Sequence, residues 1–274
     1  MFLKRKDNIF MLTRVISAVV MFAILGVCVF LSPISRVLLL CVCALCALLE
    51  MGNAMRRLRF HIEQIPLTIY IVVHSVLCLF QTQFWTYVCA YGAVLLSILC
   101  ICIVKNRAKD ALGTLFVLNY PMLLFAFVIW VLMQDNWKIT SATACFATWL
   151  CDAFALFGGK LIGKHKLAPH VSPNKTIEGA ICGAVFSLLG GLAAWYILKD
   201  TFELSVITAL LTALIASTMG QFGDLAASLF KRAAGLKDYS KLIPGHGGML
   251  DRADSLLFAI PTAWICFKVL GLLY

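Results

Sequence analysis

Residues 84–104 read FWTYVCAYGAVLLSILCICIV, a run without a single charged side chain. At a rise of about 1.5 Å per residue, a helix of this length spans about 30 Å, the thickness of the hydrocarbon core of a bilayer. A helix also satisfies its own backbone hydrogen bonds, which lipid cannot do. The run therefore predicts a transmembrane helix.

The rest of the chain resembles this run in composition, because 62% of all residues are hydrophobic and only 13% are charged. Soluble proteins carry roughly a quarter charged residues. We therefore expect an all-α integral membrane protein, a polytopic bundle of about nine transmembrane helices with its active site on the cytoplasmic side. The nine apolar runs are residues 12–32, 35–50, 65–80, 84–104, 113–133, 140–157, 176–198, 204–220 and 254–273.

Basic residues support this count, since Lys and Arg near the ends of spans collect on the cytoplasmic side. With the N-terminus inside, nine spans place 19 of the 23 Lys and Arg residues on the inner side. The outer side receives only Arg36, Lys138, Lys199 and Lys268. The net charge of +10 then reflects cations that face anionic lipids of the inner leaflet, and no nucleic-acid partner is expected.

No repeat or low-complexity linker divides the chain, so residues 1–274 are expected to form one polytopic membrane domain. Its N-terminal spans lie in about 12–133, and its motif-bearing spans and loops lie in about 140–274. The N-terminal segment is expected to be a first span rather than a cleaved signal peptide. Pro121 and Pro261 predict kinks in the fifth and ninth spans.

Cysteine and histidine in the apolar runs are expected to serve packing. All twelve cysteines lie within or at the edges of such runs, and the pair Cys43 and Cys46 lacks the His or second Cys pair that would complete a metal site. His61 and His74 have no partner motif, so we expect interfacial or packing roles.

The first of two polar loops expected on the inner face covers residues 152–179. Its lysines, Lys175 among them, supply positive charge, and its glycines permit close approach of the backbone. Ser172 or Asn174 can cap the following helix, whose positive end then faces an anion. The loop is therefore a candidate phosphate site, although a basic loop that only binds lipid head groups explains it equally well.

The second polar loop follows the eighth apolar run. If its first residues are helical, Asp224, Ser228 and Lys231 fall on one face. Asp251 and Asp254 are three residues apart where the last span begins. Carboxylates near several cations suit Mg²⁺ with a nucleotide, because Mg²⁺ takes protein carboxylates together with phosphate oxygens and waters. For one aspartate alone, capping of the last helix is the simpler explanation.

The stretch from Ser228 to Asp254 resembles the signature of the phosphatidate cytidylyltransferase family, also called CDP-diacylglycerol synthases. The residues that match in type and spacing are Ser228, Lys231, Arg232, Lys237, Asp238, Ser240, Ile243, Pro244, His246, Gly247, Gly248, Asp251, Arg252 and Asp254. Residues 172–179 and 223–225 resemble other pieces of the family, so the resemblance covers about residues 152–254. Leu156 and Ala253 depart from the family pattern without removing a charged group.

The resemblance implies that CTP and phosphatidate react to CDP-diacylglycerol and pyrophosphate, a step of phospholipid biosynthesis, in a bacterial inner (plasma) membrane. The lipid phosphate attacks the α-phosphorus of CTP, so the enzyme positions the substrates and neutralises charge. The expected roles are Mg²⁺ binding for Asp224, Asp251 and Asp254; charge neutralisation for Lys175, Lys231, Arg232 and Arg252; hydrogen bonding for Ser228 and His246; nucleotide binding for Ser172 and Asn174; and orientation of a lysine, or a water-mediated metal contact, for Asp152.

Two other classes of function stay open. A CTP-dependent membrane lipid kinase would need similar charges, and only the signature favours attack at the α-phosphorus. A secondary transporter would place polar groups near the bilayer midplane, whereas here they cluster at one end of the later spans, with Glu50 as an acidic residue elsewhere without an assigned role. A monovalent cation between the aspartates and a homodimer are also left open.

Overall fold

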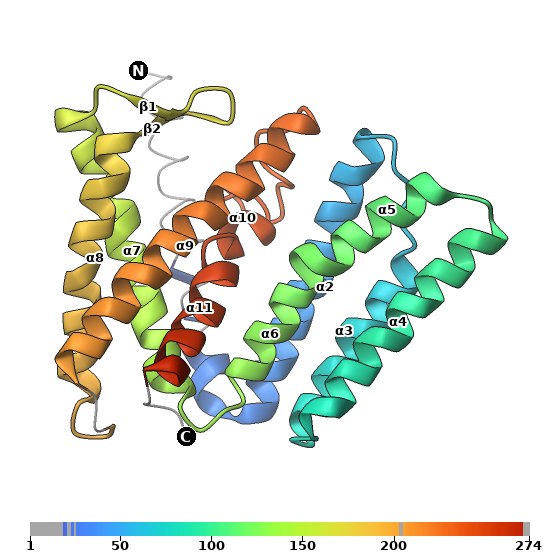
Figure 1. The fold of residues 1–274 in the computed structure, drawn as a ribbon, viewed down its shortest axis with the longest axis horizontal. Coiled ribbons are helices and arrows are strands. Elements are labelled where there is room, and N and C mark those ends of the chain that lie inside the picture. Colours follow the sequence, from blue (N-terminus) through green and yellow to red (C-terminus); the bar gives the residue numbers. More distant parts are fainter. Residues whose placement is uncertain (1–18, 21–22, 25, 203–204, 271–274) are drawn as a thin grey trace. The chain divides into compact units, whose positions relative to one another are not determined.

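The computed structural model describes residues 19–270 apart from residues 21–22, 25 and 203–204. The N-terminal segment, for which an uncleaved first span is expected, lies largely outside the described residues. The described chain is mostly helical (Figure 1). Its elements are α2 (Pro33–Arg57), α3 (Gln64–Leu79), α4 (Phe84–Val104), α5 (Ala108–Val117), η1 (Leu118–Met122), α6 (Leu123–Val131), α7 (Trp137–Ile162), β1 (Lys166–Ala168), β2 (Ser172–Thr176), α8 (Ile177–Leu198), α9 (Val206–Ala233), α10 (Leu250–Ala253) and α11 (Leu256–Val269).

In the described residues, six helical segments are long and apolar enough to cross a membrane: α2, α4, the run from α5 to α6, α7, α8 and α9. The chain is thus an all-α polytopic membrane protein. The expected count of about nine spans is not confirmed, because α3 has 16 residues and α11 has 14, both short for a span.

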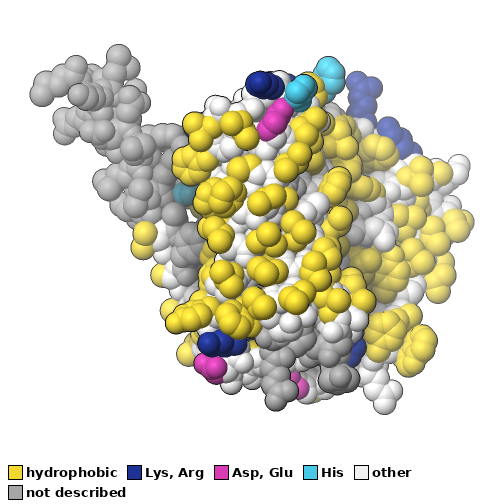
Figure 2. Space-filling view, turned by 60° about the vertical axis from the view of Figure 1, so that its left-hand side comes forward, with side chains coloured by type: hydrophobic (Ala, Val, Ile, Leu, Met, Phe, Trp, Pro, Cys, Tyr) yellow, Lys and Arg dark blue, Asp and Glu magenta, His cyan; other side chains and the backbone are white. Residues whose placement is uncertain are grey.

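The surface of the helices agrees with a lipid environment. Figure 2 shows a broad band of apolar side chains, with charged side chains near its upper and lower margins and His near the upper one. On α8, for example, Ile181, Val185 and Leu189 are exposed. Apolar side chains turned outward over the length of a span are suited to contact with lipid tails.

Local sequence explains several boundaries. Ser32 caps α2, since its Oγ accepts a hydrogen bond from the N–H of Ser35 at 3.0 Å and Pro33 follows at the first helical position. The fifth expected span is interrupted at Tyr120, whose φ of −137° and ψ of 114° are not helical. Proline disfavours the helical conformation in the residue before it, so the kink expected from Pro121 is confirmed.

Two expected boundaries were wrong. The eighth apolar run does not end in a loop at residue 220, because α9 continues through the polar residues to Ala233. Alanine and leucine in this segment are strong helix formers, so loss of hydrophobicity does not end the helix. Neither Ser172 nor Asn174 caps the next helix, because both belong to β2, which pairs antiparallel with β1; the cap is Thr176.

The chain forms two compact units. The first comprises Met1–Met133 and Ala233–Arg252, and the second comprises Gln134–Arg232 and Ala253–Tyr274. The segment Ala233–Arg252, which carries much of the signature, thus belongs with the N-terminal helices rather than with the expected motif-bearing half. The expectation of a single polytopic domain stays a prediction.

Each unit has its own core. In the first, α2 packs against α3, α5 and α6, and the fully buried side chains include Tyr70 and Met122. In the second, α7 and α8 are in extensive contact because small residues line the seam: a Cβ at Gly190 would lie 2.6 Å from the backbone nitrogen of Ala147. Phe267 of α11 is fully buried in this unit.

Candidate active site

The second unit brings one residue of each polar loop into direct contact. Lys175, at the end of the β1–β2 hairpin, donates a hydrogen bond from Nζ to Oδ2 of Asp224 on α9. Ser228, one turn further along α9, donates from Oγ to Oδ1 of the same carboxylate at 3.3 Å. Asp224 and Ser228 therefore lie on one face of α9, as their spacing predicts. The partly exposed Asp224 carboxylate binds both the Lys175 ammonium and the Ser228 hydroxyl group.

The contact of α9 with the hairpin and with the beginning of α8 extends over several turns of α9. Gln221 donates from Nε2 to the carbonyl oxygen of Ala180 at 3.2 Å, and Arg232 donates from Nε to the carbonyl oxygen of Val171 at 3.3 Å. Lys231 is buried on the same stretch of helix. The later part of α9 therefore lies along the hairpin and the beginning of α8, and cations from both motifs gather there.

The hairpin itself is fastened to the first turn of α8. The Glu178 carboxylate accepts hydrogen bonds from the backbone N–H of Lys164 at 3.0 Å and of His165 at 3.2 Å. Thr176 Oγ1 accepts from the N–H of Gly179 at 3.1 Å and so caps the helix. Negative charge at a helix N-terminus is stabilising, so Glu178 both anchors the hairpin and complements the helix dipole.

In the first unit, Asp251 organises the signature loop, residues 233–250. Its Oδ2 accepts hydrogen bonds from the backbone N–H of Tyr239 at 2.8 Å and of Gly248 at 2.9 Å, and the residue is buried. Within the loop, the N–H of Ile243 donates to the carbonyl oxygen of Gly247 at 2.9 Å. Two backbone donors from positions nine residues apart therefore meet on one carboxylate oxygen, and this fixes the path of the loop.

Glu50 is a site residue that sequence reasoning did not place. It is 4% exposed on α2, and its carboxylate accepts from Ser240 Oγ at 2.6 Å, from the N–H of Met249 at 2.9 Å and from the N–H of Leu250 at 2.8 Å. The one available signal was an acidic residue in an apolar run, which in a membrane protein marks a functional site by default.

A cavity of about 540 Å³ adjoins this loop in the first unit. Two arginines of α2, Arg56 and Arg57, face it together with Asn53, and Tyr239 and Ser240 line it from the loop. Guanidinium groups bind phosphate and carboxylate oxygens well, so the cavity suits an anion.

The remaining predicted residues have varied surroundings. Asp254 is buried, and its Oδ1 accepts from the N–H of Ser255 at 2.7 Å. His246 and Ser172 are partly buried, and Asp152, Asn174 and Arg252 are exposed.

The expected metal cluster can be compared with the described residues. Among these, no three His, Cys, Asp or Glu side chains gather as protein ligands of one metal ion. A metal site shared by Asp224, Asp251 and Asp254 stays a prediction. Within its own unit, Asp224 contacts Lys175 and Ser228, and Asp251 accepts hydrogen bonds from the backbone of its own loop.

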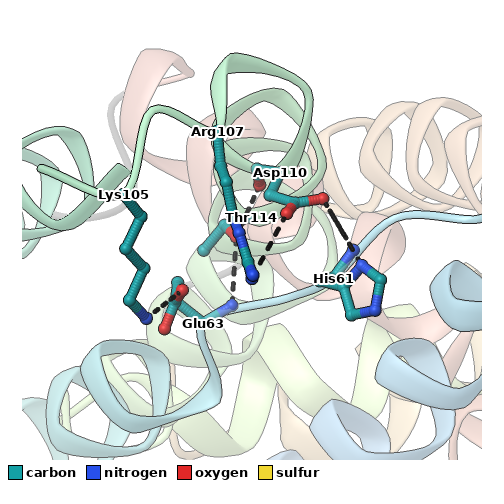
Figure 3. A network of polar contacts seen from close by, with 6 residues as sticks. All are labelled: His61, Glu63, Lys105, Arg107, Asp110 and Thr114. Carbon is teal, nitrogen blue, oxygen red and sulfur yellow. Dashed lines mark hydrogen bonds and ion pairs between the residues drawn. The ribbon is translucent and has the colours of Figure 1, made fainter. Parts of the chain in front are cut away.

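A separate polar network in the first unit fastens two connections between helices (Figure 3). Lys105 Nζ pairs with Glu63 at 2.6 Å, and Asp110 accepts from the backbone N–H of His61 at 2.9 Å. His74, buried in α3, contacts the carbonyl oxygen of Ala126 at 2.8 Å, which confirms its packing role. These groups bind one another and hold the chain in place.

The sequence profile described as "Cytidylyltransferase family" matches residues 12–270. The "Phosphatidate cytidylyltransferase" of Staphylococcus haemolyticus (strain JCSC1435) is 47% identical over 118 residues, which are 43% of this chain and 45% of that protein. The protein of the same name from Bacillus subtilis (strain 168) is 39% identical over 175 residues, or 63% of this chain and 64% of that protein. The chain thus spans about half the length of the staphylococcal relatives that it matches.

Proposed function

This chain belongs to the cytidylyltransferase family, and from that premise we propose that it is a phosphatidate cytidylyltransferase, converting CTP and phosphatidate to CDP-diacylglycerol and pyrophosphate. The observation that carries the proposal is the meeting of Lys175, Asp224 and Ser228, because residues of two separate motifs form one charged site there. The shared name of the relatives supports the same substrates.

The proposed reaction needs no nucleophile from the protein. A phosphate monoester has a second pKa of about 6, so the lipid phosphate is largely dianionic at neutral pH and attacks the α-phosphorus of CTP itself. The protein must align the two phosphates and offset their repulsion. We assign this task to Lys175, Lys231 and Arg232, with Ser228 as a hydrogen-bond donor.

The contact between Lys175 and Asp224 gives these residues a second role. A lysine ammonium on a flexible stem can exchange one anionic partner for another, so an arriving phosphate can replace the carboxylate as the partner of Lys175. Asp224 holds the ammonium near the hairpin until then. In this proposal the ion pair is the resting arrangement of a phosphate-binding lysine.

Asp224, Asp251 and Asp254 remain the proposed ligands of a divalent cation, with Mg²⁺ the natural companion of CTP. Their oxygen donors have the chemistry that Mg²⁺ prefers, and one or two carboxylates suffice where phosphates and waters complete the octahedron. Such an ion would neutralise charge on the phosphate oxygens. A further monovalent cation stays a prediction.

The proposal also sets an orientation in the membrane. CTP is too polar to cross a bilayer, so both polar loops should face the cytoplasm of a bacterial cell, with exposed cations near anionic lipids of the inner leaflet.

Single cysteines at Lys164 and Lys237 in a background without native thiols should be protected from an impermeant external reagent, whereas cysteines at Asp135 and Asp200 should react. Lys237 is suited to labelling because its side chain is exposed. Opposite sides for Lys164 and Lys237 would contradict the proposal. Crosslinking in the same membranes will test the homodimer that the sequence leaves open.

The decisive experiment is incubation of the purified chain with CTP, Mg²⁺ and phosphatidate, followed by product analysis. A CDP-lipid and pyrophosphate are the expected products. CDP together with a lipid that has gained a phosphate would instead identify a CTP-dependent lipid kinase, and no turnover of either kind would remove the enzymatic proposal.

A further inference from the structure

Glu50, buried on the apolar helix α2, accepts hydrogen bonds from three donors of the signature loop. Ser240, Met249 and Leu250 all donate to it, and these residues lie about 190 to 200 positions away along the chain. A buried carboxylate is costly unless donors satisfy it, and charge-assisted hydrogen bonds are the stronger kind. The Glu50 side chain therefore connects α2 to two points of the signature loop, Ser240 and the Met249–Leu250 backbone.

Gly248 shows how closely the loop approaches this carboxylate. A Cβ at Gly248 would lie 2.5 to 2.7 Å from the carboxyl atoms of Glu50, a distance that real Cβ atoms do not show. On its other side, the N–H of Gly248 donates to Asp251 at 2.9 Å. The backbone at Gly248 thus lies between two carboxylates. A shift of the Glu50 side chain would move Gly248 and change its hydrogen bond to Asp251.

The same contact shapes the cavity beside the loop. Glu50 binds Ser240, and Asp251 binds the backbone of Tyr239, so carboxylates hold two of the three loop residues that line the cavity. Arg56 and Arg57 lie on α2, six and seven residues after Glu50, and face the same cavity. One helix therefore supplies both the cations of the cavity and the residue that fixes its opposite wall.

We propose that Glu50 is a positioning residue, which holds residues 239–250 so that Asp251 and the wall of the arginine-lined cavity are arranged for a phosphate-bearing substrate. This inference rests on the proposed function for its substrate. A carboxylate only accepts hydrogen bonds and serves all three donors. A glutamine would turn an NH₂ group toward at least one of them, and the mismatch would loosen the loop.

Hydrogen exchange tests the positioning without any assay of activity. In Glu50→Gln, the amides of Met249 and Leu250 should exchange at least about tenfold faster, as expected when buried hydrogen bonds are lost, and those of Tyr239 and Gly248 should follow. Glu63→Gln is the matched control, because Glu63 is also an acid of the first unit but pairs with a surface lysine. Unchanged exchange throughout the loop in Glu50→Gln would overturn the proposal.

Ser240→Ala is the substitute variant if the Glu50→Gln protein does not insert into the membrane. It removes only the hydroxyl donor, so the loop amides should exchange faster by a smaller factor than in Glu50→Gln. Gly248→Ala should perturb the same amides, and its effect should not add to that of Glu50→Gln, since both act at one contact. Full additivity would contradict the shared contact.

Kinetics separates positioning from a general loss of stability. Glu50→Gln should raise the half-saturating concentrations of CTP and Mg²⁺ about tenfold at equal amounts of folded protein, and Glu50→Asp should recover part of the loss. Glu63→Gln should match the parent. Equal half-saturating concentrations in Glu50→Gln and the parent would remove the positioning role. A parent without CDP-lipid synthesis would refute the proposed function alone, because the exchange experiment stands without it.

Discussion

Asp224 and Asp251 were both expected to bind a metal ion, yet the structure surrounds their carboxylates with different kinds of donor. Asp251 accepts two backbone N–H groups at 2.8 and 2.9 Å, and Asp224 accepts an ammonium and a hydroxyl group from side chains. Backbone donors cannot leave unless the loop opens, whereas side chains rotate away within nanoseconds. The region around Asp251 is thus built to keep its shape, and the region around Asp224 can exchange partners.

Substitution of the aspartates in either region should give the largest effects. Asp224→Asn, Asp251→Asn and Asp254→Asn should each lower turnover by about 10²-fold or more, because each removes a charge from a proposed metal ligand with little change in volume. Turnover is measured at saturating Mg²⁺ on inserted protein. Near-normal turnover in all three variants would refute the metal assignment.

Hydrogen exchange on the same variants sharpens the comparison. Asp251→Asn should also speed exchange at the amides of Tyr239 and Gly248, since it weakens the acceptor of both. Asp224→Asn should leave these two amides as they are in the parent. Equal behaviour of the two variants would mean that the carboxylates do not differ in the way their contacts indicate.

The cations around Asp224 should give intermediate effects. Lys175→Ala and Arg232→Ala should each cost about 1.5–3 kcal/mol in kcat/KM if their phosphate contacts are direct, and should make the rate more sensitive to salt. Lys164→Ala is the matched control, because Lys164 lies in the same polar loop with an exposed side chain. If all three variants behave alike, Lys175 and Arg232 are ordinary interfacial cations.

The smallest effect is expected at the ion pair between Glu63 and Lys105. It joins two connections between helices, and the lysine side chain is 46% exposed. Exposed pairs contribute about 0–1 kcal/mol, so Lys105→Met should change the free energy of unfolding by no more than that and leave turnover unchanged. Denaturation in detergent measures the first and the product assay the second. A large loss of turnover would mean that the network in Figure 3 serves the reaction.

Asp224 and Ser228 in the second unit, and Pro121 in the first, show how much the local sequence predicts. Asp224 and Ser228 were placed on one helical face from their spacing alone, and Pro121 interrupts its helix as expected. Both depend on neighbours within one or two turns, so the sequence contains the whole cause. The hairpin at Ser172 escaped prediction, because the residues that cap helices are also common in turns and in the strands beside them.

The sequence by itself determined that this is a helical membrane protein of a recognisable family, because hydrophobicity, charge bias and motif spacing are local properties that packing does not alter. Only the tertiary structure decided which groups meet. In the folded protein, Lys175 binds a carboxylate 49 residues away, and Glu50 accepts hydrogen bonds from backbone amides 199 and 200 residues away. No local pattern encodes such pairs, since they exist only once helices distant in the chain pack together and a buried carboxylate must take the donors that the fold brings to it.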